Sequence, residues 1–352
     1  MYKRIVVKVG SRVISEEGRL NEEAVKHIVT QVAELRARGV EVILVTSGAT
    51  ASGKGHLKVS GPTHSIEERQ VFASVGQIGL MFLYAKSFND LGFTCAQILV
   101  TKGDFRDKDH YANIRKCFQN LLKRGVIPVV NENDAIAISE LVFSDNDELA
   151  GLIASQLNAE AVFMLTSVEG VMVGDGGETK VVREVNAGNA KEVEGFIDET
   201  ISASGRGGMK TKFEIAKKLM KQGITTYVLN GKKEHAVVDA FDGKGSGTMF
   251  TPEGKLSAVK RRLAHAAGFS KGSATVNEGA EKILLSKTSS LLPVGIVKID
   301  GTFGKGDVIE VKGESGRKIG YGIAQYSSDD AREAMGKKGA KELIHCDYLF
   351  IE

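Results

Sequence analysis

The chain has 352 residues, of which 42% are hydrophobic and 26% are charged, and its formal net charge at pH 7 is +3. This length exceeds what one ordinary hydrophobic core supports, so two domains are expected. So small a net charge does not by itself indicate a nucleic-acid-binding protein and is equally compatible with small anionic substrates. The apolar stretch 5–10 is interrupted by Lys8 and is far too short for a signal or membrane segment, so we expect a cytoplasmic protein that does not enter a membrane.

Short β-branched runs alternate with amphipathic helical stretches through the first two-thirds of the chain, which is typical of βαβ units around a largely parallel sheet. In the first unit, a strand at 5–7 leads to a turn at Gly10, and a helix follows that Asn21 caps and Gly39 ends. Further strands are expected at 40–46, 94–100, 126–131, 161–166 and 225–229, and further helices at 66–88, 111–124, 145–156 and 209–222. The pattern predicts an α/β fold, a three-layer αβα sandwich with a largely parallel sheet.

The pattern changes after Leu229. A charged helical stretch is expected at 252–268, and glycines then become frequent among short strands such as 295–299 and 308–311. We therefore expect a catalytic domain at 1–255, a linker at 256–271 and a small C-terminal β-rich barrel domain at 272–352.

Ligands of open parallel sheets bind beyond the carboxyl ends of the strands. The first strand ends at Lys8 and the Gly10 turn, where an ammonium group and backbone N–H groups could approach a phosphate, although a lysine there could also simply face solvent. The second strand ends in the small-residue turn 46–49, which leaves room for a ligand but is also a common turn composition.

Two polar clusters follow, at 131–134 after a strand and at 144–147 before a helix. N-capping by Ser144 or Asp145 would explain one of these residues but not the whole set. A binding interpretation assigns their amide and carboxylate groups to the ammonium and α-carboxylate groups of a substrate, and leaves one aspartate to orient catalytic lysines.

A glycine-rich loop, 204–212, opens the next helix and ends in Lys212. By the logic of other phosphate loops it predicts a phosphate site, although its order differs from the Walker pattern and a flexible surface loop remains the alternative. A nucleophilic triad is not expected, because the seven histidines are scattered along the chain. The cysteines Cys95, Cys117 and Cys346 lack CxxC or Cys/His spacing, so neither a zinc site nor a disulfide framework is predicted.

Five motifs in this order resemble the amino-acid-kinase family, and within it the kinases of L-glutamate. They are Val7-Lys8-Val9-Gly10-Ser11, Thr46-Ser47-Gly48-Ala49, Asn131-Glu132-Asn133-Asp134, Asp145-Asn146-Asp147 and Gly207-Gly208-Met209-Lys210-Thr211-Lys212. The C-terminal segment, with Leu291-Leu292-Pro293-Val294-Gly295 and Gly304-Lys305-Gly306-Asp307, resembles a PUA domain.

The resemblance implies that ATP phosphorylates the γ-carboxylate of L-glutamate to γ-glutamyl 5-phosphate, the first step of proline biosynthesis. It implies that Lys8 and Lys212 flank the transferred group and that Asp147 holds both ammonium groups. This suits phosphoryl transfer, which needs neutralisation of charge on the equatorial oxygens. No general base is required, because the acceptor carboxylate is already ionised at pH 7. Mg²⁺ would be held chiefly by the phosphates, so no protein metal site is expected.

The resemblance also implies the binding residues. Those for the substrate are Ser47, Gly48, Asn131, Asp134 and Asn146. Those for ATP are Lys8, Gly10, Thr166, Ser167, Gly207, Gly208, Met209, Lys210, Thr211 and Lys212. The chain departs from the family pattern at Ser167, where aspartate is common, at Met172, where tyrosine is usual, and at Arg206, where threonine is usual. Nucleotide contacts at these positions stay open.

Three alternatives remain. Another acceptor of the family, namely acetylglutamate, aspartate, carbamate or UMP, would use the same chemistry. RNA binding through the PUA-like domain could use the basic runs at 260–262 and 337–338, but no aromatic interleaving supports base stacking. A catalytically inactive regulator of amino-acid levels is the third. The resemblance further implies proline as a feedback inhibitor and a homo-oligomer, either a dimer or a tetramer.

Overall fold

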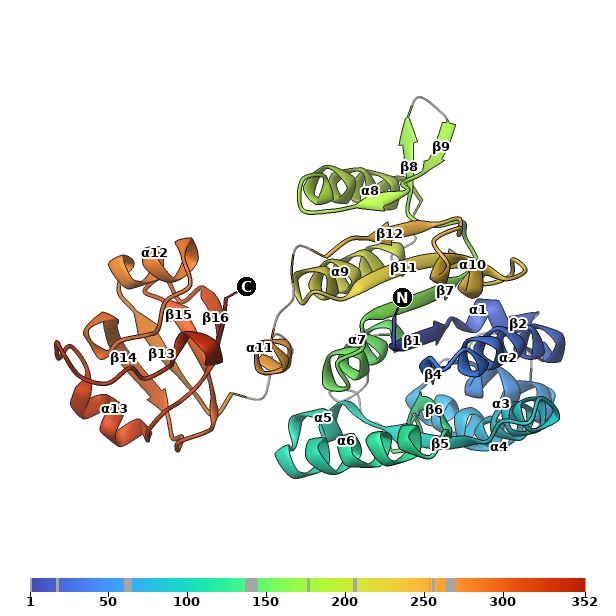
Figure 1. The fold of residues 1–352 in the computed structure, drawn as a ribbon, viewed down its shortest axis with the longest axis horizontal. Helices are drawn as coiled ribbons and strands as arrows, with labels where there is room; N and C mark the ends of the chain where they lie inside the picture. Colours follow the sequence, from blue (N-terminus) through green and yellow to red (C-terminus); the bar gives the residue numbers. More distant parts are fainter. Residues whose placement is uncertain are drawn as a thin grey trace. The chain divides into compact units, whose positions relative to one another are not determined.

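The computed structural model describes residues 2–16, 19–59, 65–136, 145–175, 178–204, 208–252, 254, 257–263 and 270–351. The chain divides into two compact units, Met1–Lys255 and Leu256–Glu352. Each has its own sheet, and Figure 1 shows helices on both faces of the larger one.

Unit 1 is built on an eight-stranded sheet in the order β10-β12-β11-β7-β1-β4-β6-β5. Strands β11 and β12 pair antiparallel, whereas the other neighbours pair in parallel. The strands are β1 (Arg4–Val9), β4 (Glu41–Val45), β5 (Cys95–Val100), β6 (Ile127–Glu132), β7 (Ala161–Thr166), β10 (Glu184–Val185), β11 (Thr225–Asn230) and β12 (Thr248–Phe250). The predicted α/β sandwich with a largely parallel sheet is confirmed.

Helices cover both faces of this sheet, as Figure 1 shows. One face carries α2 (Glu22–Ala37), α4 (Ile66–Asp90) and α10 (Ala236–Phe241), with α3 (Ala49–Leu57) packed on α4. The other carries α6 (Lys108–Lys123), α7 (Asn146–Gln156) and α9 (Gly208–Lys221), with α5 (Lys102–Arg106) and α8 (Ala190–Ser204) beside them. The smaller elements of unit 1 are α1 (Ser11–Ile14), the hairpin β2 (Ser15–Glu16) and β3 (Arg19–Leu20), and the hairpin β8 (Met172–Asp175) and β9 (Glu178–Val181).

The alternation of side chains along β1 decides which face each residue serves. Ile5, Val7 and Val9 join the core under α2 and α4. Val6 and Lys8 therefore point to the opposite face, where α7 packs against β1. The position of Lys8 below the α7 layer thus follows from the strand register alone.

Helix α4 is long and apolar enough to cross a membrane by length and composition, as judged on the described residues. Its apolar side chains Leu80, Tyr84 and Phe88 are fully buried in the core of unit 1. Packing against the sheet therefore accounts for these apolar positions of α4.

Unit 2 contains a five-stranded sheet in the order β14-β13-β15-β16-β17. Its elements are α11 (Ala258–Leu263), β13 (Gly272–Val276), α12 (Glu278–Ser286), η2 (Pro293–Gly295), β14 (Ile296–Gly301), β15 (Val308–Gly313), β16 (Lys318–Ile323), α13 (Ser328–Ala334), η3 (Cys346–Tyr348) and β17 (Leu349–Ile351). The expected C-terminal β-rich domain is present, and the strands expected at 295–299 and 308–311 fall in β14 and β15.

The charged helix expected at 252–268 starts later in the structure, since α11 begins at Ala258 and is described through Leu263. Pro252 and Gly254 are both non-helical, as residues that disfavour a helix interior should be. Residues 264–269 lie outside the described part. The segment expected as a linker is also not free there, because Leu263 is buried against Tyr321 and Phe350 of unit 2.

Helices α3 and α4 approach each other through glycines. A Cβ atom on Gly53 would lie 1.8 Å from the carbonyl oxygen of Phe72, and one on Gly76 would lie 1.9 Å from that of Ala49. Sequence reasoning predicted only a turn at Ala49, where α3 in fact begins. The close contact fixes the N-terminus of α3 against α4.

We predict that Gly53→Ala destabilises the protein by about 1–3 kcal/mol, because its methyl group must push two backbones apart. The matched control is Gly55→Ala in the same helix, where an added Cβ would meet only the Arg19 side chain at 3.6 Å. That change should be neutral or stabilising through helix propensity. Urea unfolding of both variants checks this, and equal free energies of unfolding would contradict it.

Candidate active site

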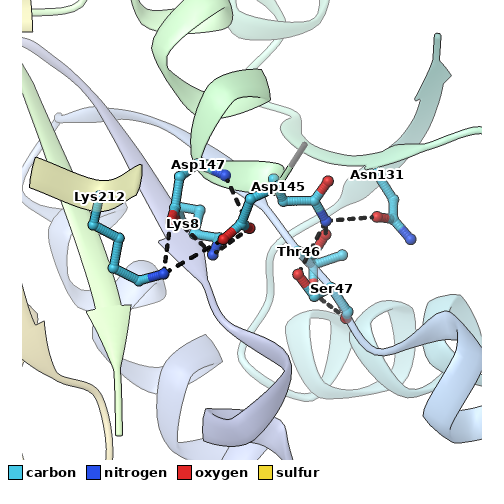
Figure 2. Close-up of polar contacts among 8 residues, drawn as sticks. Lys8, Thr46, Ser47, Asn131, Asp145, Asp147 and Lys212 are labelled. Carbon is cyan, nitrogen blue, oxygen red and sulfur yellow. Dashed lines mark hydrogen bonds and ion pairs between the residues drawn. The ribbon is translucent and has the colours of Figure 1, made fainter. Parts of the chain in front are cut away.

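Two lysines from distant parts of unit 1 converge on two aspartates at the start of α7, as Figure 2 shows. The Lys8 Nζ lies 2.6 Å from Asp147 Oδ1, and the Lys212 Nζ lies 2.7 Å from Asp147 Oδ2. Asp145 makes longer contacts, 3.3 Å to Lys8 Nζ and 3.5 Å to Lys212 Nζ. Asp147 therefore bridges the two ammonium groups with its two carboxylate oxygens.

Burial separates the roles of the two aspartates. The side chain of Asp147 is fully buried and that of Lys8 is 3% exposed, whereas the side chains of Lys212 and Asp145 are 12% and 32% exposed. Lys8 and Asp147 thus form the enclosed half of the cluster, while Lys212 and Asp145 reach toward solvent. A ligand entering from solvent meets Asp145 and Lys212 first.

The charges hold one another in the ionised state. Burial alone would raise the pKa of the Asp145 carboxyl, but the Lys8 and Lys212 ammonium groups outweigh it and lower that pKa to about 2. For Lys212, burial acts to lower the pKa, and the Asp147 and Asp145 carboxylates more than compensate and raise it. Lys212 therefore carries its positive charge throughout the neutral range.

The local sequence explains how Asp147 is placed. Asp145 caps α7, and its Oδ1 accepts the Asp147 N–H at 3.3 Å. The capping interpretation of this cluster is therefore correct for Asp145, and the same residue also pairs with the lysines. Ser144 lies outside the described residues.

The Asn146 amide joins the end of β4 to the end of β6. Its Nδ2 donates to the Thr46 carbonyl oxygen at 2.7 Å, to Ser47 Oγ at 3.0 Å and to Asn131 Oδ1 at 3.1 Å. Thr46 directly follows β4, and Asn131 lies at the end of β6. The two polar clusters of the sequence, 131–134 and 144–147, thus meet in one network.

A cavity of about 440 Å³ lies beside this network. It is lined by Ser11, Ser47, Gly48, Ala49, Thr50, Ala51, Arg69, Asn131, Glu132, Asp134, Asp145 and Asn146. All five predicted substrate-binding residues are among them. Gly48 has a φ of 105°, which favours glycine, and it starts α3 so that the first turn of that helix faces the cavity. Free backbone N–H groups of a first helical turn suit a carboxylate.

Sequence reasoning missed Arg69 and assigned no role to Glu132. Arg69 Nη2 lies 2.6 Å from Asp134 Oδ1 and 3.1 Å from the nearly buried Glu132 Oε2. Burial raises the pKa of the Asp134 carboxyl, and the Arg69 charge only partly opposes this. Arg69 lies inside a helix and not at a strand end, so its position in the sequence gave no signal. The only hint was that Glu132 and Asp134, two nearby acidic residues, would need a cation as partner.

The residues predicted to bind ATP occupy the neighbouring strand ends. Gly10 donates its N–H to the Leu165 carbonyl oxygen at 3.1 Å, and a Cβ on Gly10 would lie 3.0 Å from that oxygen. Thr166 ends β7 and accepts the Gly231 N–H at 2.9 Å. Ser167 follows directly, so the ends of β1 and β7 form one backbone surface beside Lys8.

The glycine-rich loop enters α9, which begins at Gly208. Met209, Lys210, Thr211 and Lys212 form its first turns, and Lys212 reaches the aspartates. Gly207 and Arg206 lie outside the described residues. None of the residues 208–212 lines the 440 Å³ cavity, so the residues predicted to bind the substrate and those predicted to bind ATP at 208–212 lie apart. The individual roles stay predictions.

A cluster beside the predicted ATP-binding residue Ser167 was not predicted. Asn230 Nδ2 donates to Glu169 Oε1 at 3.0 Å, and Lys233 pairs with Glu169 Oε2. This ties the loop after β7, next to Ser167, to the end of β11. Neither Glu169 nor Asn230 lies in a recognised motif.

A model of the amino acid kinase family matches residues 3–230, and a model of the PUA domain matches residues 272–346. Glutamate 5-kinase of Chlorobaculum tepidum is 44% identical over 354 aligned residues, covering 100% of this chain and 98% of that protein. Glutamate 5-kinase of Bacteroides thetaiotaomicron is 42% identical and covers 100% of this chain and 99% of that protein.

Solved structures share the fold at low sequence identity. Carbamate kinase from Giardia lamblia bound to AMP-PNP has a TM-score of 0.51 and 15% identity, and the match covers 71% of this chain and 99% of that one. N-acetylglutamate synthase from Neisseria gonorrhoeae has a TM-score of 0.54 and 14% identity, covering 72% and 61%. The family match and the full-length relatives together show that this chain belongs to the amino acid kinase family and carries a PUA domain at its C-terminal end.

Proposed function

We propose that this protein transfers the γ-phosphoryl group of ATP to the γ-carboxylate of L-glutamate, forming γ-glutamyl 5-phosphate and ADP. The observation that carries the proposal is the Asp147 carboxylate between the Lys8 and Lys212 ammonium groups. It lies between the substrate cavity and the strand ends predicted to bind ATP. The names of relatives more than two-fifths identical over the full chain support glutamate as the acceptor.

Charge neutralisation is the main task of such a site. The acceptor carboxylate and the γ-phosphoryl group are both negative and repel each other as they approach. Two ammonium groups fixed by Asp147 are already oriented, so little reorganisation is needed when the equatorial oxygens gain charge. Asp147 makes the shorter contacts, and the longer contacts to Asp145 leave that side of both lysines available to phosphate oxygens.

The cavity offers complementary groups to the two ends of an amino acid. The first turn of α3 and the Ser47 hydroxyl suit a carboxylate, and Asp134 suits an ammonium group. The Asn146 Nδ2 is engaged by three acceptors, and no hydrogen bond to its Oδ1 is seen among the described residues. That oxygen can therefore accept from the substrate ammonium group.

Magnesium fits this donor set only as an ion carried by ATP. Among the described residues between the two sides, Asp145 and Asp147 are the carboxylates, and both already pair with lysines. When bound with ATP, Mg²⁺ would neutralise part of the phosphate charge.

Several further assignments belong to the same proposal. The product would enter proline biosynthesis in the cytoplasm, and proline would act as a feedback inhibitor, as the family resemblance implies. A homo-oligomer, dimer or tetramer, is supported by Val71, Ile78 and Phe82, which are 53%, 75% and 71% exposed on α4 beside the edge strand β5. RNA binding by unit 2 rests on the PUA match and on the exposed Lys337 and Lys338.

An acceptor panel tests the proposed reaction. With ATP and Mg²⁺, release of ADP should be fastest with L-glutamate among L-glutamate, N-acetylglutamate, aspartate, carbamate and UMP. The reason is that the cavity offers groups to both the α-carboxylate and the ammonium group, and an acylated or missing ammonium group makes no ion pair with Asp134. Equal or faster turnover of another acceptor would refute the assignment.

We predict that Asp147→Asn lowers kcat by at least about 10²-fold, because a neutral amide no longer holds two ammonium groups in place. It should also lower the free energy of unfolding, because Lys8 is left buried with a weaker partner. Asp145→Asn is the matched control, with longer contacts and a more exposed side chain, and its loss of stability should be smaller. Steady-state kinetics and urea unfolding measure both. An Asp147→Asn enzyme with wild-type kcat would contradict the role given to this carboxylate.

Asp134 gives a pH-dependent prediction. Its raised pKa means that it becomes protonated, and loses its attraction for the substrate ammonium group, at a higher pH than an ordinary aspartate. The KM for glutamate should therefore rise as pH falls toward that pKa, while Asp145, with a pKa of about 2, stays ionised.

The variant Asp134→Asn separates this effect from titration of glutamate itself, which both enzymes share. Its KM should be higher at neutral pH, and its kcat/KM should fall less steeply on the acid side. If the acid limbs of kcat/KM for the two enzymes coincide, Asp134 does not control binding.

A further inference from the structure

The orientation of the Asn131 amide is set by groups around it. Its Oδ1 accepts from the Glu132 N–H at 2.9 Å and from Asn146 Nδ2 at 3.1 Å. Its Nδ2 donates to Gln77 Oε1 at 3.0 Å. Gln77 belongs to α4 and occurs in none of the motifs of the sequence.

Two backbone groups make this arrangement directional. The Glu132 N–H can only donate, so it requires the oxygen of Asn131 on its side. The Thr46 carbonyl can only accept, so it requires the nitrogen of Asn146. In this orientation Asn131 Nδ2 faces α4, where Gln77 Oε1 is the acceptor that receives it. The reversed Asn131 amide would place an N–H₂ group against both the Glu132 N–H and Asn146 Nδ2.

The direction of these hydrogen bonds decides which atom of Asn146 faces the substrate. Because Asn146 Nδ2 is turned toward Asn131, Ser47 and Thr46, its Oδ1 is the atom left for the cavity that Asn146 lines. An oxygen there accepts from an ammonium group, whereas an N–H₂ group there would repel it. Gln77 is therefore two hydrogen bonds away from the atom that recognises the substrate.

The position of Gln77 is itself fixed by packing. The preceding residue, Gly76, lies so close to Ala49 that an added Cβ would be 1.9 Å from the Ala49 carbonyl oxygen. Helix α4 therefore cannot rotate or slide against α3 without a clash. The far side of Gln77 faces a second cavity of about 280 Å³, and its Nε2 makes a long contact of 3.4 Å with Oε1 of the exposed Gln97.

We propose that Gln77 is a positioning residue for substrate recognition: its Oε1 fixes the Asn131 amide, which in turn directs Asn146 Oδ1 to the ammonium group of the acceptor. The inference rests on the proposed glutamate kinase activity. Gln77 does not touch the reacting atoms, so its removal affects binding of the amino acid rather than phosphoryl transfer.

The test compares three variants in an ADP-release assay. Gln77→Leu removes the acceptor at similar size and should raise the KM for L-glutamate about tenfold, with kcat and the KM for ATP within about twofold of wild type. Gln77→Glu keeps an oxygen facing Asn131 Nδ2 and should restore a KM near that of wild type. Gln97→Leu removes only the long outer contact and should leave all three constants unchanged.

A double variant separates positioning from general packing. Asn131→Leu alone should raise the KM for glutamate. Adding Gln77→Leu to it should raise that KM no further, because the hydrogen bonds that connect Gln77 to Asn146 through Asn131 are already lost. Thermal unfolding of each variant checks that the fold persists. A merely structural role for Gln77 would instead lower the melting temperature and kcat together and would not be rescued by glutamate at position 77.

The outcomes distinguish this inference from the proposed function. If wild-type protein does not phosphorylate glutamate, the proposed function is wrong. If wild-type protein does so and Gln77→Leu has an unchanged KM, or Gln77→Glu fails to restore it, the positioning role is wrong and the kinase assignment stands.

Discussion

The Asp147 carboxylate, enclosed between two ammonium groups, is the interaction on which the rest of unit 1 depends. Without it, the Lys8 and Lys212 ammonium groups would face each other at the edge of the core, and the Lys8 side chain is almost fully buried. Removing an ion from water costs several kcal/mol, and only good geometry with an opposite charge offsets this. The three groups come from β1, α7 and α9, so strand register, helix capping and helix packing must together bring them to the same place.

The parallel sheet makes that agreement possible. The ends of β1, β4, β6 and β7 lie side by side in the sheet order, so residues that follow each strand meet although they are far apart in sequence. Side-chain alternation then sends Lys8 toward α7, and the Asp145 cap starts α7 where Asp147 can reach it. Asp147 therefore holds the two lysines in place. Asp145 is more exposed and makes longer contacts, so a ligand can approach the lysines on its side.

Much of this arrangement could be predicted from the sequence, because strand ends and helix starts carry local signals. Lys8, Asp147 and Lys212 each stand at such a position, and the cavity gathers the predicted Ser47 and Asn146. Residues inside helices gave no such signal. Arg69 and Gln77 lie within α4, whose sequence indicates only an apolar core helix, and their roles depend on how that helix meets the end of β6. The later start of α11 was missed because charged residues favour a helix locally, whereas Pro252 and Gly254 disfavour a helix interior.

Helix α4 therefore does more than cover the sheet. Its glycine contact with α3 holds the first turn of α3 at the cavity, its Arg69 partly neutralises Asp134 and Glu132, and its Gln77 orients Asn131. Helix α4 thus holds in place both the groups that suit the carboxylate of an amino acid and those that suit its ammonium group. A rigid reference matters because the reacting carboxylate must lie in line with the phosphoryl group, and an error of about 1 Å in a remote contact can cost about 10²-fold in rate. Selection of the acceptor and its alignment for transfer would then both depend on the same helix packing.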